Sequence, residues 1–238
     1  RPHNMRTFPV LNPIRSRFAA KGFDILHPFA TSSVPRGHLR NSDDTDRLGL
    51  IVGSTKNIWT PFVKSLGSLD HVPLNPFDDY VTHEIEQLTQ TLNLPVSDIL
   101  YPQETDPDRI ISFQTLGALT NLSHYAKELG LCVHEEYGVW FAFRACIILD
   151  SPPTSIGLNS SDPLPLPLSF PCTKETQKVA AAHMQQLVAG ESNDWLKLRD
   201  TVVVGADWRY EYEQLMYHYG DAEQRHHVVK QYLRNGGT

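Results

Sequence analysis

An almost uninterrupted apolar run, Val139–Leu149, constrains the fold of this sequence more than any other feature. Continuous apolar runs without polar alternation are typical of strands that are buried on both faces of a sheet. One charged residue, Arg144, lies inside the run, and a buried guanidinium needs a partner. That partner is either a core carboxylate or an anion bound at the sheet edge, because the donors of arginine form a fork that fits carboxylates and phosphates. The residue types alone favour neither alternative.

Other segments predict further strands of the same sheet. Leu48–Gly53 is a short apolar run bounded by glycines, and Ser97–Tyr101 is a second candidate strand. Leu131–Glu135 and Val139–Leu149 flank residues 137–138, a spacing that predicts a β-hairpin in the middle of the sheet.

Helical spacing of apolar residues predicts the other elements, and it is most sustained over Arg109–Leu129, which Gly130 ends. The remaining predicted helices are Ile14–Gly22, Ser54–Leu66, Asn75–Thr91, Thr173–Gly190, and two that begin near Asp207 and Asp221. This order of elements predicts one α+β domain over residues 1–238, with loop-rich segments at 1–13 and 151–172, a mobile loop at 30–46, and a helical C-terminal third at 173–235.

Composition excludes several classes of function. The chain has 21 Lys and Arg against 27 Asp and Glu, a formal net charge of -6, and no basic block, so it lacks the electrostatic signature of nucleic-acid binding. No apolar stretch reaches the roughly 20 residues of a membrane-spanning helix. There is no secretory pattern, and three cysteines, Cys132, Cys146 and Cys172, are too few for a disulfide framework. We therefore expect a cytoplasmic protein with reduced thiols.

Sequence motifs for common chemistries are missing. The chain has no Gly-x-Gly-x-x-Gly, P-loop or Gly-x-Ser-x-Gly pattern. The histidines with the most suggestive positions, His134, His218, His226 and His227, do not adopt a zinc spacing. We predict no metal site formed by the protein, and the residues alone identify no catalytic group.

Two segments are rich in aromatic residues, and we interpret one as packing surface and the other as a candidate border of a ligand site. The run Trp208–Tyr219 is dense in aromatic residues and is typical of packing surface. The cluster Tyr137–Phe141 could instead border a planar ligand, because Gly138 would let a ring approach the backbone closely.

A series of short motifs in fixed order points to one family. They are Gly22-Phe23, His27-Pro28-Phe29, Asn75–Asp78, Phe113–Thr115, Cys132–His134, Gly138–Arg144, Asp194-Trp195, Leu198–Asp200, Arg209–Gln214 and Glu223–Arg225. From about Phe18 to Leu233 the chain thus resembles the cobalamin-processing family of the human methylmalonic aciduria and homocystinuria type C protein, whose activities are cyanocobalamin reductase and alkylcobalamin dealkylase.

The resemblance implies a fold, a reaction and a set of site residues. The fold would be flavin-reductase-like or nitroreductase-like, a layered antiparallel sheet with flanking helices. The reaction would remove the upper axial ligand of cobalamin (vitamin B12), by decyanation or dealkylation, with glutathione or reduced flavin (FMN or FAD). The residues that match the glutathione-binding arginines are Arg144, Arg199 and Arg225, so the resemblance favours an anion as the partner of Arg144. The cofactor pocket would be formed by Gln114, Thr115, Ala118, Tyr125, His134, Tyr137, Gly138, Val139, Trp140 and Phe141.

The sequence also departs from the family pattern, which indicates a divergent member. Ala118 stands where the pattern has a histidine, and Val139 and Ala145 stand where it has glycines. Replacement of a glycine by Val139 could narrow the pocket. Two alternatives therefore stay open: a flavin-dependent oxidoreductase that acts on another substrate, and a non-catalytic carrier or chaperone that passes a cofactor on. A homodimer and a downstream cobalamin-trafficking protein are the partners that we expect.

Overall fold

A four-stranded antiparallel sheet forms the centre of the computed structural model, which describes residues 8–35, 37–39, 45–159, 171–191 and 194–233. The strands lie in the order β1 (Ile25–Ala30), β2 (Leu48–Ser54), β6 (Ala142–Leu149) and β3 (Val96–Leu100). All seven residues of β2 are buried, and β2 pairs with β6 in a register that sets Ile51 opposite Cys146. The two continuous apolar runs are therefore the central strands, as predicted.

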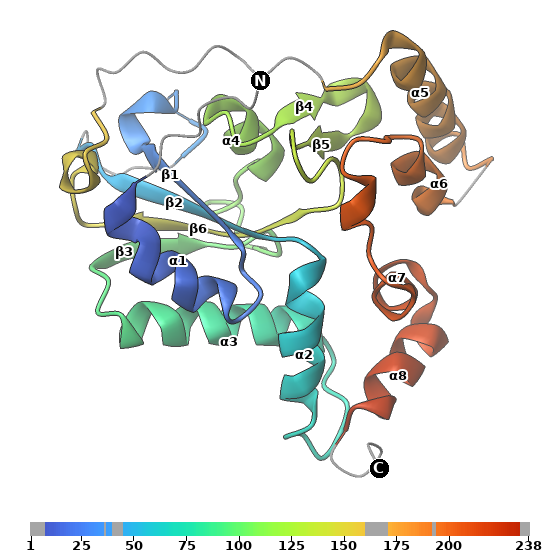
Figure 1. Ribbon diagram of the computed structural model, residues 1–238, viewed down its shortest axis with the longest axis horizontal. Helices are drawn as coiled ribbons and strands as arrows, with labels where there is room; N and C mark the ends of the chain where they lie inside the picture. The colour runs from blue at the N-terminus through green and yellow to red at the C-terminus, as the bar shows by residue number, and fades with distance from the viewer. Residues whose placement is uncertain (1–7, 36, 40–44, 160–170, 192–193, 234–238) are drawn as a thin grey trace.

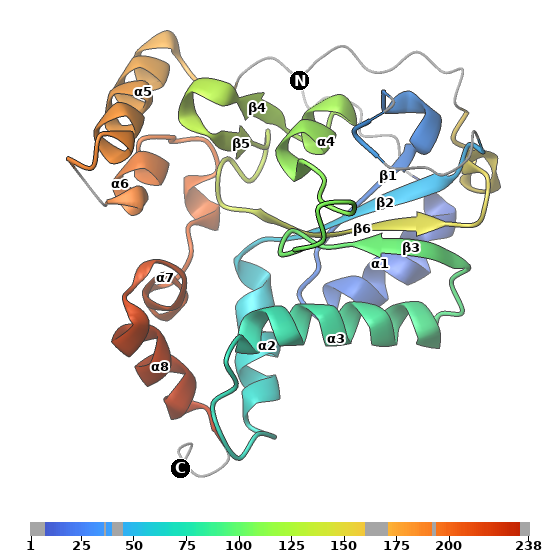
Figure 2. The same ribbon diagram turned by 180° about the vertical axis from the view of Figure 1, so that it is seen from behind.

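Helices cover one face of this sheet (Figures 1 and 2). They are α1 (Asn12–Ala19), α2 (Trp59–Leu66) and α3 (Pro76–Thr91). Successive residues of a strand point to opposite faces. Leu50 and Ile147 accordingly pack in the core cluster beneath these helices, which contains Phe62, whereas Ile51 packs in a second cluster on the other face. The α+β arrangement of an antiparallel sheet with flanking helices is confirmed.

The opposite face is covered by a short helix and a small second sheet. The helix is α4 (Phe113–Leu119), and the two strands are β4 (His124–Ala126) and β5 (Leu131–Val133), which are antiparallel. The prediction of one long helix over Arg109–Leu129 is therefore wrong.

Tertiary contacts explain why the helix is shorter than its apolar spacing suggests. Arg109 is held by Asp98 and Glu104 before the helix begins. At the other end, the ring of His27 on β1 makes a hydrogen bond with the carbonyl oxygen of Thr120 at 2.8 Å, and the next residue, Asn121, has a φ of +58°. A left-handed residue just after a helix is a common termination signal.

The predicted hairpin around residues 137–138 is also wrong. β5 pairs with β4, whereas β6 pairs with β2 and β3, so the two segments belong to different sheets. A single isolated bridge joins His134 to Gly138. The physical reason is that Gly138, at a φ of +57°, packs directly against the backbone of Val204, which turns the chain away before β6 begins at Ala142.

The strand β1 was not predicted from the sequence. For this part of the chain only a short helix ending at Gly22 was expected. β1 contains Pro28, which cannot donate a backbone hydrogen bond. The strand tolerates this residue because it lies at the edge of the sheet, next to β2 alone. The helix itself, α1, ends at Ala19.

Short 3-10 helices connect several of these elements. They are η1 (Pro9–Leu11), η2 (Thr31–Ser33), η3 (Lys56–Ile58), η4 (Lys127–Leu129) and η5 (Pro153–Ile156). Parts of the segments predicted as loops, namely residues 1–7, 36, 40–44 and 160–170, lie outside the described residues.

The C-terminal third forms a column of helices beside the sheet (Figure 1). Its elements are α5 (Lys174–Val188), α6 (Trp195–Asp200), η6 (Ala206–Trp208), α7 (Tyr212–Tyr219) and α8 (Ala222–Gln231). Thr173 caps α5, and Asp221 and Gln224 form a capping box at α8, which agrees with the predicted helix starts. The helix predicted to begin near Asp207 forms as the turn η6 followed by α7, which starts only at Tyr212. The helix α6 was not predicted. In the described ranges, no helix is long and apolar enough to cross a membrane.

Candidate functional site

Arg144 lies near the start of β6, and its side chain contacts neutral groups. Its Nε donates a hydrogen bond to the buried Ser54 Oγ at 2.8 Å, and its guanidinium carbon lies 4.6 Å from the ring centre of Phe77. No carboxylate of the described chain lies within ion-pair distance of this guanidinium. Burial lowers the pKa of Arg144, because the charged form loses hydration. The described residues therefore do not form the core ion pair that one interpretation of the sequence required.

Arg199 on α6 has the same kind of environment. It donates from Nη1 to the carbonyl oxygen of Val139, and its guanidinium carbon lies 5.8 Å from the ring of Trp140 and 5.6 Å from the ring of Tyr219. Cations within about 6 Å of an aromatic ring centre are attracted to its face. The rings therefore position this charge without neutralising it.

Arg225 on α8 completes the set. Its Nε donates to the carbonyl oxygen of Tyr217 at 3.1 Å, and its guanidinium carbon lies 5.8 Å from the ring of the same tyrosine. Neither Arg199 nor Arg225 forms an ion pair with a carboxylate in the portions of the chain that the structure describes.

The charges of all three arginines act on one imidazole, that of His218 on α7. Burial lowers the pKa of His218 to about 3, with additional lowering from the positive charges of Arg144, Arg199 and Arg225. The ring of His218 also lies 5.0 Å from that of Phe77, on which Arg144 stacks. We call Arg144, Arg199 and Arg225 the arginine cluster. It brings positive charge from a strand and two helices near a neutral histidine, and no carboxylate of the described residues forms an ion pair with it.

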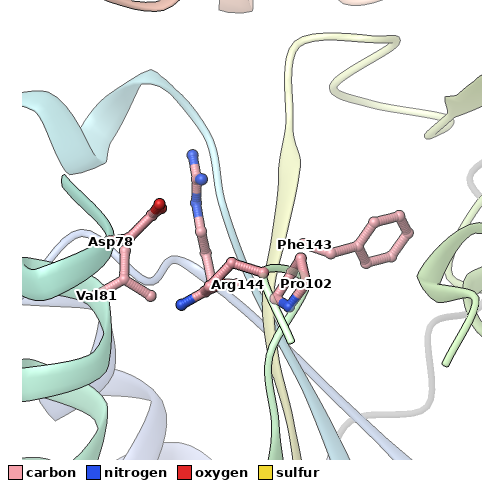
Figure 3. A pocket seen from close by; sticks show the side chains of 6 residues that line it. Asp78, Val81, Pro102, Phe143 and Arg144 are labelled. Carbon is pink, nitrogen blue, oxygen red and sulfur yellow. The ribbon is translucent and has the colours of Figure 1, made fainter. Parts of the chain in front are cut away.

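A small cavity lies beside the cluster (Figure 3). Its volume is about 200 Å³, and Asp78, Val81, Pro102, Gln103, Phe143 and Arg144 line it. Figure 3 shows the side chains of Asp78 and Arg144 on one side of β6 and that of Phe143 on the other. Pockets for small molecules usually measure roughly 300–1,000 Å³. The cavity is thus large enough for part of a ligand but not for a corrin ring.

The residues predicted for the cofactor pocket fall into two groups. Gln114, Thr115 and Ala118 on α4, and Tyr125 on β4, retain exposed or partly exposed side chains. α4 and the small sheet lie against each other, and Cys132 Sγ is 3.8 Å from the carbonyl oxygen of Gln114. This side of the molecule keeps surface that a ligand can reach.

The second group follows β5 and is mostly enclosed by protein. His134 stacks on Tyr137 with ring centres 4.4 Å apart, and its Nδ1 accepts backbone hydrogen bonds from Glu136 and Tyr137 at 3.0 and 3.3 Å. Burial lowers the pKa of His134 to about 4, so the imidazole is neutral at physiological pH. Phe141 is also buried and packs edge-on to His134.

The role expected for Gly138 needs correction. A Cβ atom at this position would overlap the carbonyl oxygen of Val204, so the glycine allows two backbone segments to meet and leaves no space there for a ligand ring. The side chains of Val139 and Trp140 lie in a core cluster with Tyr210. Through the Val139 carbonyl oxygen and the Trp140 ring, this segment also supports Arg199.

Sequence reasoning missed the groups that organise the arginine cluster. Ser54, Phe77 and His218 contact the arginines or their rings, although the sequence analysis gave none of them this role. The signal that could have found His218 is the aromatic run Trp208–Tyr219, which was interpreted as packing surface. A histidine within such a run is a polar group that needs a hydrogen-bond partner when it is buried.

The fold and the site together define an α+β protein that presents an unpaired, ring-supported arginine cluster suited to an anionic ligand. No family model matches the chain. The chain is 26% identical to the cyanocobalamin reductase / alkylcobalamin dealkylase of Danio rerio, over an alignment of 252 positions that covers 95% of this chain and 94% of that protein. It is 25% identical to the protein of the same name from Gallus gallus over 131 residues, which is about half of each chain. The resemblance inferred from the sequence motifs is thereby confirmed, and this identity fits a divergent relative.

A solved structure agrees with the sequence comparison. The chain matches the crystal structure of a Caenorhabditis elegans B12-trafficking protein, CblC, described as a homologue of human MMACHC, with a TM-score of 0.69. The match has 18% sequence identity and covers 93% of this chain and 94% of that one. At this identity the match shows a shared fold.

Proposed function

We propose that this protein processes cobalamin and removes its upper axial ligand, with glutathione as the thiol that the arginine cluster binds. The observation that supports this most strongly is that Arg144, Arg199 and Arg225 all act electrostatically on one neutral imidazole, while no described carboxylate forms an ion pair with them. The names of the relatives from zebrafish and chicken support cobalamin as the substrate.

The cluster suits glutathione because this tripeptide carries two carboxylates. A guanidinium can bind a carboxylate with two parallel hydrogen bonds, which fixes orientation as well as charge. Nearby positive charge also favours the thiolate over the thiol, and the thiolate is the nucleophile. The protein would therefore contribute mainly positioning and electrostatic stabilisation.

Dealkylation then follows as a simple transfer. The thiolate sulfur attacks the cobalt-bound carbon of methylcobalamin, a sulfur–carbon bond forms, and the cobalt–carbon bond breaks. The electron pair of the broken bond stays on cobalt, and the thiol proton has already been released to solvent. The products are S-methylglutathione and cob(I)alamin.

Removal of cyanide is a reduction, and we propose reduced FMN or FAD as its electron donor. A cationic site such as the arginine cluster fits a flavin phosphate as well as a carboxylate. The flavin-reductase-like or nitroreductase-like description of the fold belongs to this proposal, which the family resemblance supports.

For the corrin, we propose the surface formed by Gln114, Thr115, Ala118 and Tyr125, which keep exposed or partly exposed side chains. Ala118 offers no imidazole to cobalt, so the corrin would bind without a protein ligand at that position. A single domain, a cytoplasmic location, homodimer formation and transfer to a downstream trafficking protein complete the proposal on the same resemblance.

The decisive experiment titrates the purified protein with methylcobalamin and then adds glutathione. We expect a saturable change in the cobalamin spectrum, followed by S-methylglutathione that mass spectrometry detects. Binding without product would support a carrier instead, an alternative that the description of the C. elegans protein as a trafficking protein favours. Saturable binding of FMN without any change in the cobalamin spectrum would refute the cobalamin assignment and indicate a flavin enzyme with another substrate.

A further inference from the structure

Helix α7 carries two polar side chains whose buried atoms have no partner among the described residues. Gln214 is fully buried, and neither its Oε1 nor its Nε2 makes a hydrogen bond. The Nε2 of His218 is also buried without a partner. Residues four apart on a helix lie one above the other on the same face. One face of α7 therefore presents buried donors and acceptors that no described residue satisfies.

This face adjoins the arginine cluster. The ring of His218 lies 5.0 Å from Phe77 and 5.1 Å from Tyr217, the rings that support Arg144 and Arg225. The imidazole is also 5.7 Å from the ring of Tyr210. The unsatisfied groups and the arginines without an ion-pair partner among the described residues thus belong to one site.

We propose that Gln214 and His218 donate and accept the neutral hydrogen bonds of the ligand that the arginine cluster binds, and thereby select a peptide-like dicarboxylate over simpler ones. The inference rests on the proposed function, since it takes glutathione as that ligand. A side-chain amide offers both donors and an acceptor, which matches the N–H and C=O of a peptide group. The arginines, in contrast, offer donors only and cannot recognise a peptide carbonyl and N–H together.

The proposal predicts that removing these polar groups leaves the stability of the free protein unchanged or higher but weakens its binding of glutathione. Burying polar groups without hydrogen bonds destabilises a folded protein, and replacing them with apolar groups of similar shape is neutral or stabilising. Gln214→Met and His218→Phe keep the approximate volume, and the phenylalanine keeps the ring contacts. We expect both variants to melt at the same temperature as the wild type or higher in the absence of ligand.

Binding should change in the other direction. We expect each variant to bind glutathione about tenfold more weakly, as measured by calorimetry. Affinity for glutarate, a dicarboxylate without peptide bonds, should stay unchanged because the arginine cluster is intact. Gln186→Met on α5 and His226→Gln on α8 are matched controls, since both residues are exposed.

The possible results are distinct. Wild-type affinity for glutathione in both variants would overturn the inference, whereas a wild-type protein that binds no glutathione would overturn the proposed function on which it rests. If a variant does not fold, the wild type still decides the matter. Its His218 imidazole signal in nitrogen NMR, assigned by its loss in His218→Gln, should shift when glutathione is added, and a constant signal would overturn the inference.

Discussion

Arginine is used in two different ways in this protein, at the edge of the sheet and in the arginine cluster. Next to β3, Arg109 donates from Nε to Glu104 at 2.9 Å and from Nη2 to Asp98 at 3.0 Å, and these bonds raise its pKa. In the arginine cluster, the guanidinium groups of Arg144 and Arg225 contact rings, a hydroxyl and a backbone carbonyl instead.

The comparison distinguishes a structural contact, at Arg109, from a site that can bind a ligand, at the arginine cluster. The charge of Arg109 is compensated within the fold, so the contact serves the local turn. Among the described residues, no carboxylate forms an ion pair with the arginine cluster, and the buried side-chain atoms of Gln214 and the Nε2 of His218 have no hydrogen-bond partner. Positive charge held near other positive charge is costly, and a bound anion would compensate it.

The largest expected loss of stability comes from disrupting the contact that holds the C-terminal helices against the segment before β6. Gly138 joins the segment before β6 to the loop before α7, because its missing side chain lets the Val204 backbone approach. Gly138→Ala combines a steric overlap with an unfavourable positive φ, so we expect the free energy of unfolding to fall by about 3 kcal/mol, as urea titration would measure. Glutathione binding should be lost together with the docking of the helices.

A second glycine provides the control. Gly157 has a φ of +79° but no atom within 4 Å of an added Cβ. Gly157→Ala should therefore cost only about 1 kcal/mol, from backbone strain alone. Equal losses in the two variants would show that the close approach at Gly138 contributes nothing.

The next effect concerns the cluster itself. Arg144→Met should weaken glutathione binding about 100-fold, because a charge-assisted contact to a carboxylate disappears. Stability should change by less than about 1 kcal/mol, since relief of an uncompensated buried charge offsets the loss of the Ser54 hydrogen bond. Calorimetry measures the glutathione affinity, and thermal unfolding of the same sample measures the stability. Unchanged affinity would remove Arg144 from the site.

A pH effect tests the segment that connects the two regions. His134 has a pKa of about 4 in the folded protein, below the ordinary value near 6.5 that the unfolded chain would have. Its contribution to stability is complete above pH 6.5 and is lost as pH falls toward 4, because only the unfolded chain then binds the proton. Between pH 7.5 and 5.5 we expect the wild type to lose about 1.4 kcal/mol through this residue.

The variant His134→Asn isolates this contribution. Asparagine can accept the backbone hydrogen bonds of Glu136 and Tyr137 in place of Nδ1 but does not titrate. Urea unfolding at the two pH values should show a smaller loss in the variant than in the wild type. The same loss in both proteins would assign the pH dependence to other groups.

The smallest effect is expected at Arg109. Arg109→Met removes partly exposed ion pairs, which stabilise proteins by about 1 kcal/mol or less. Glutathione affinity should not change, in contrast to Arg144→Met. A loss of binding in the Arg109 variant would mean that the two uses of arginine are not separate.

Much of the sheet and its helices could be predicted because local pattern carries the information. The continuous apolar runs of β2 and β6 reflect burial on both faces, and the segments with helical periodicity became α3 and α5. The same reasoning failed for residues 109–129, whose apolar spacing also fits a helix. There the contact between His27 and Thr120, 93 residues apart, favours an earlier end.

The candidate site divides in the same way. Family resemblance singled out Arg144, Arg199 and Arg225 from the sequence, but their common surroundings, with Phe77 and His218 between them, depend on how α6, α7 and α8 dock. No local pattern encodes which distant side chains become neighbours.

By itself, the sequence determined the class of fold, the central strands and the residue types that could bind an anion. These follow from hydrophobic periodicity and side-chain chemistry, which act within a few residues. Only the tertiary structure decided that β5 and β6 lie in different sheets, that Gly138 meets Val204, and that buried atoms of Gln214 and His218 find no partner among the described residues. These features arise from long-range packing, in which a contact forms only when the whole chain has placed both partners.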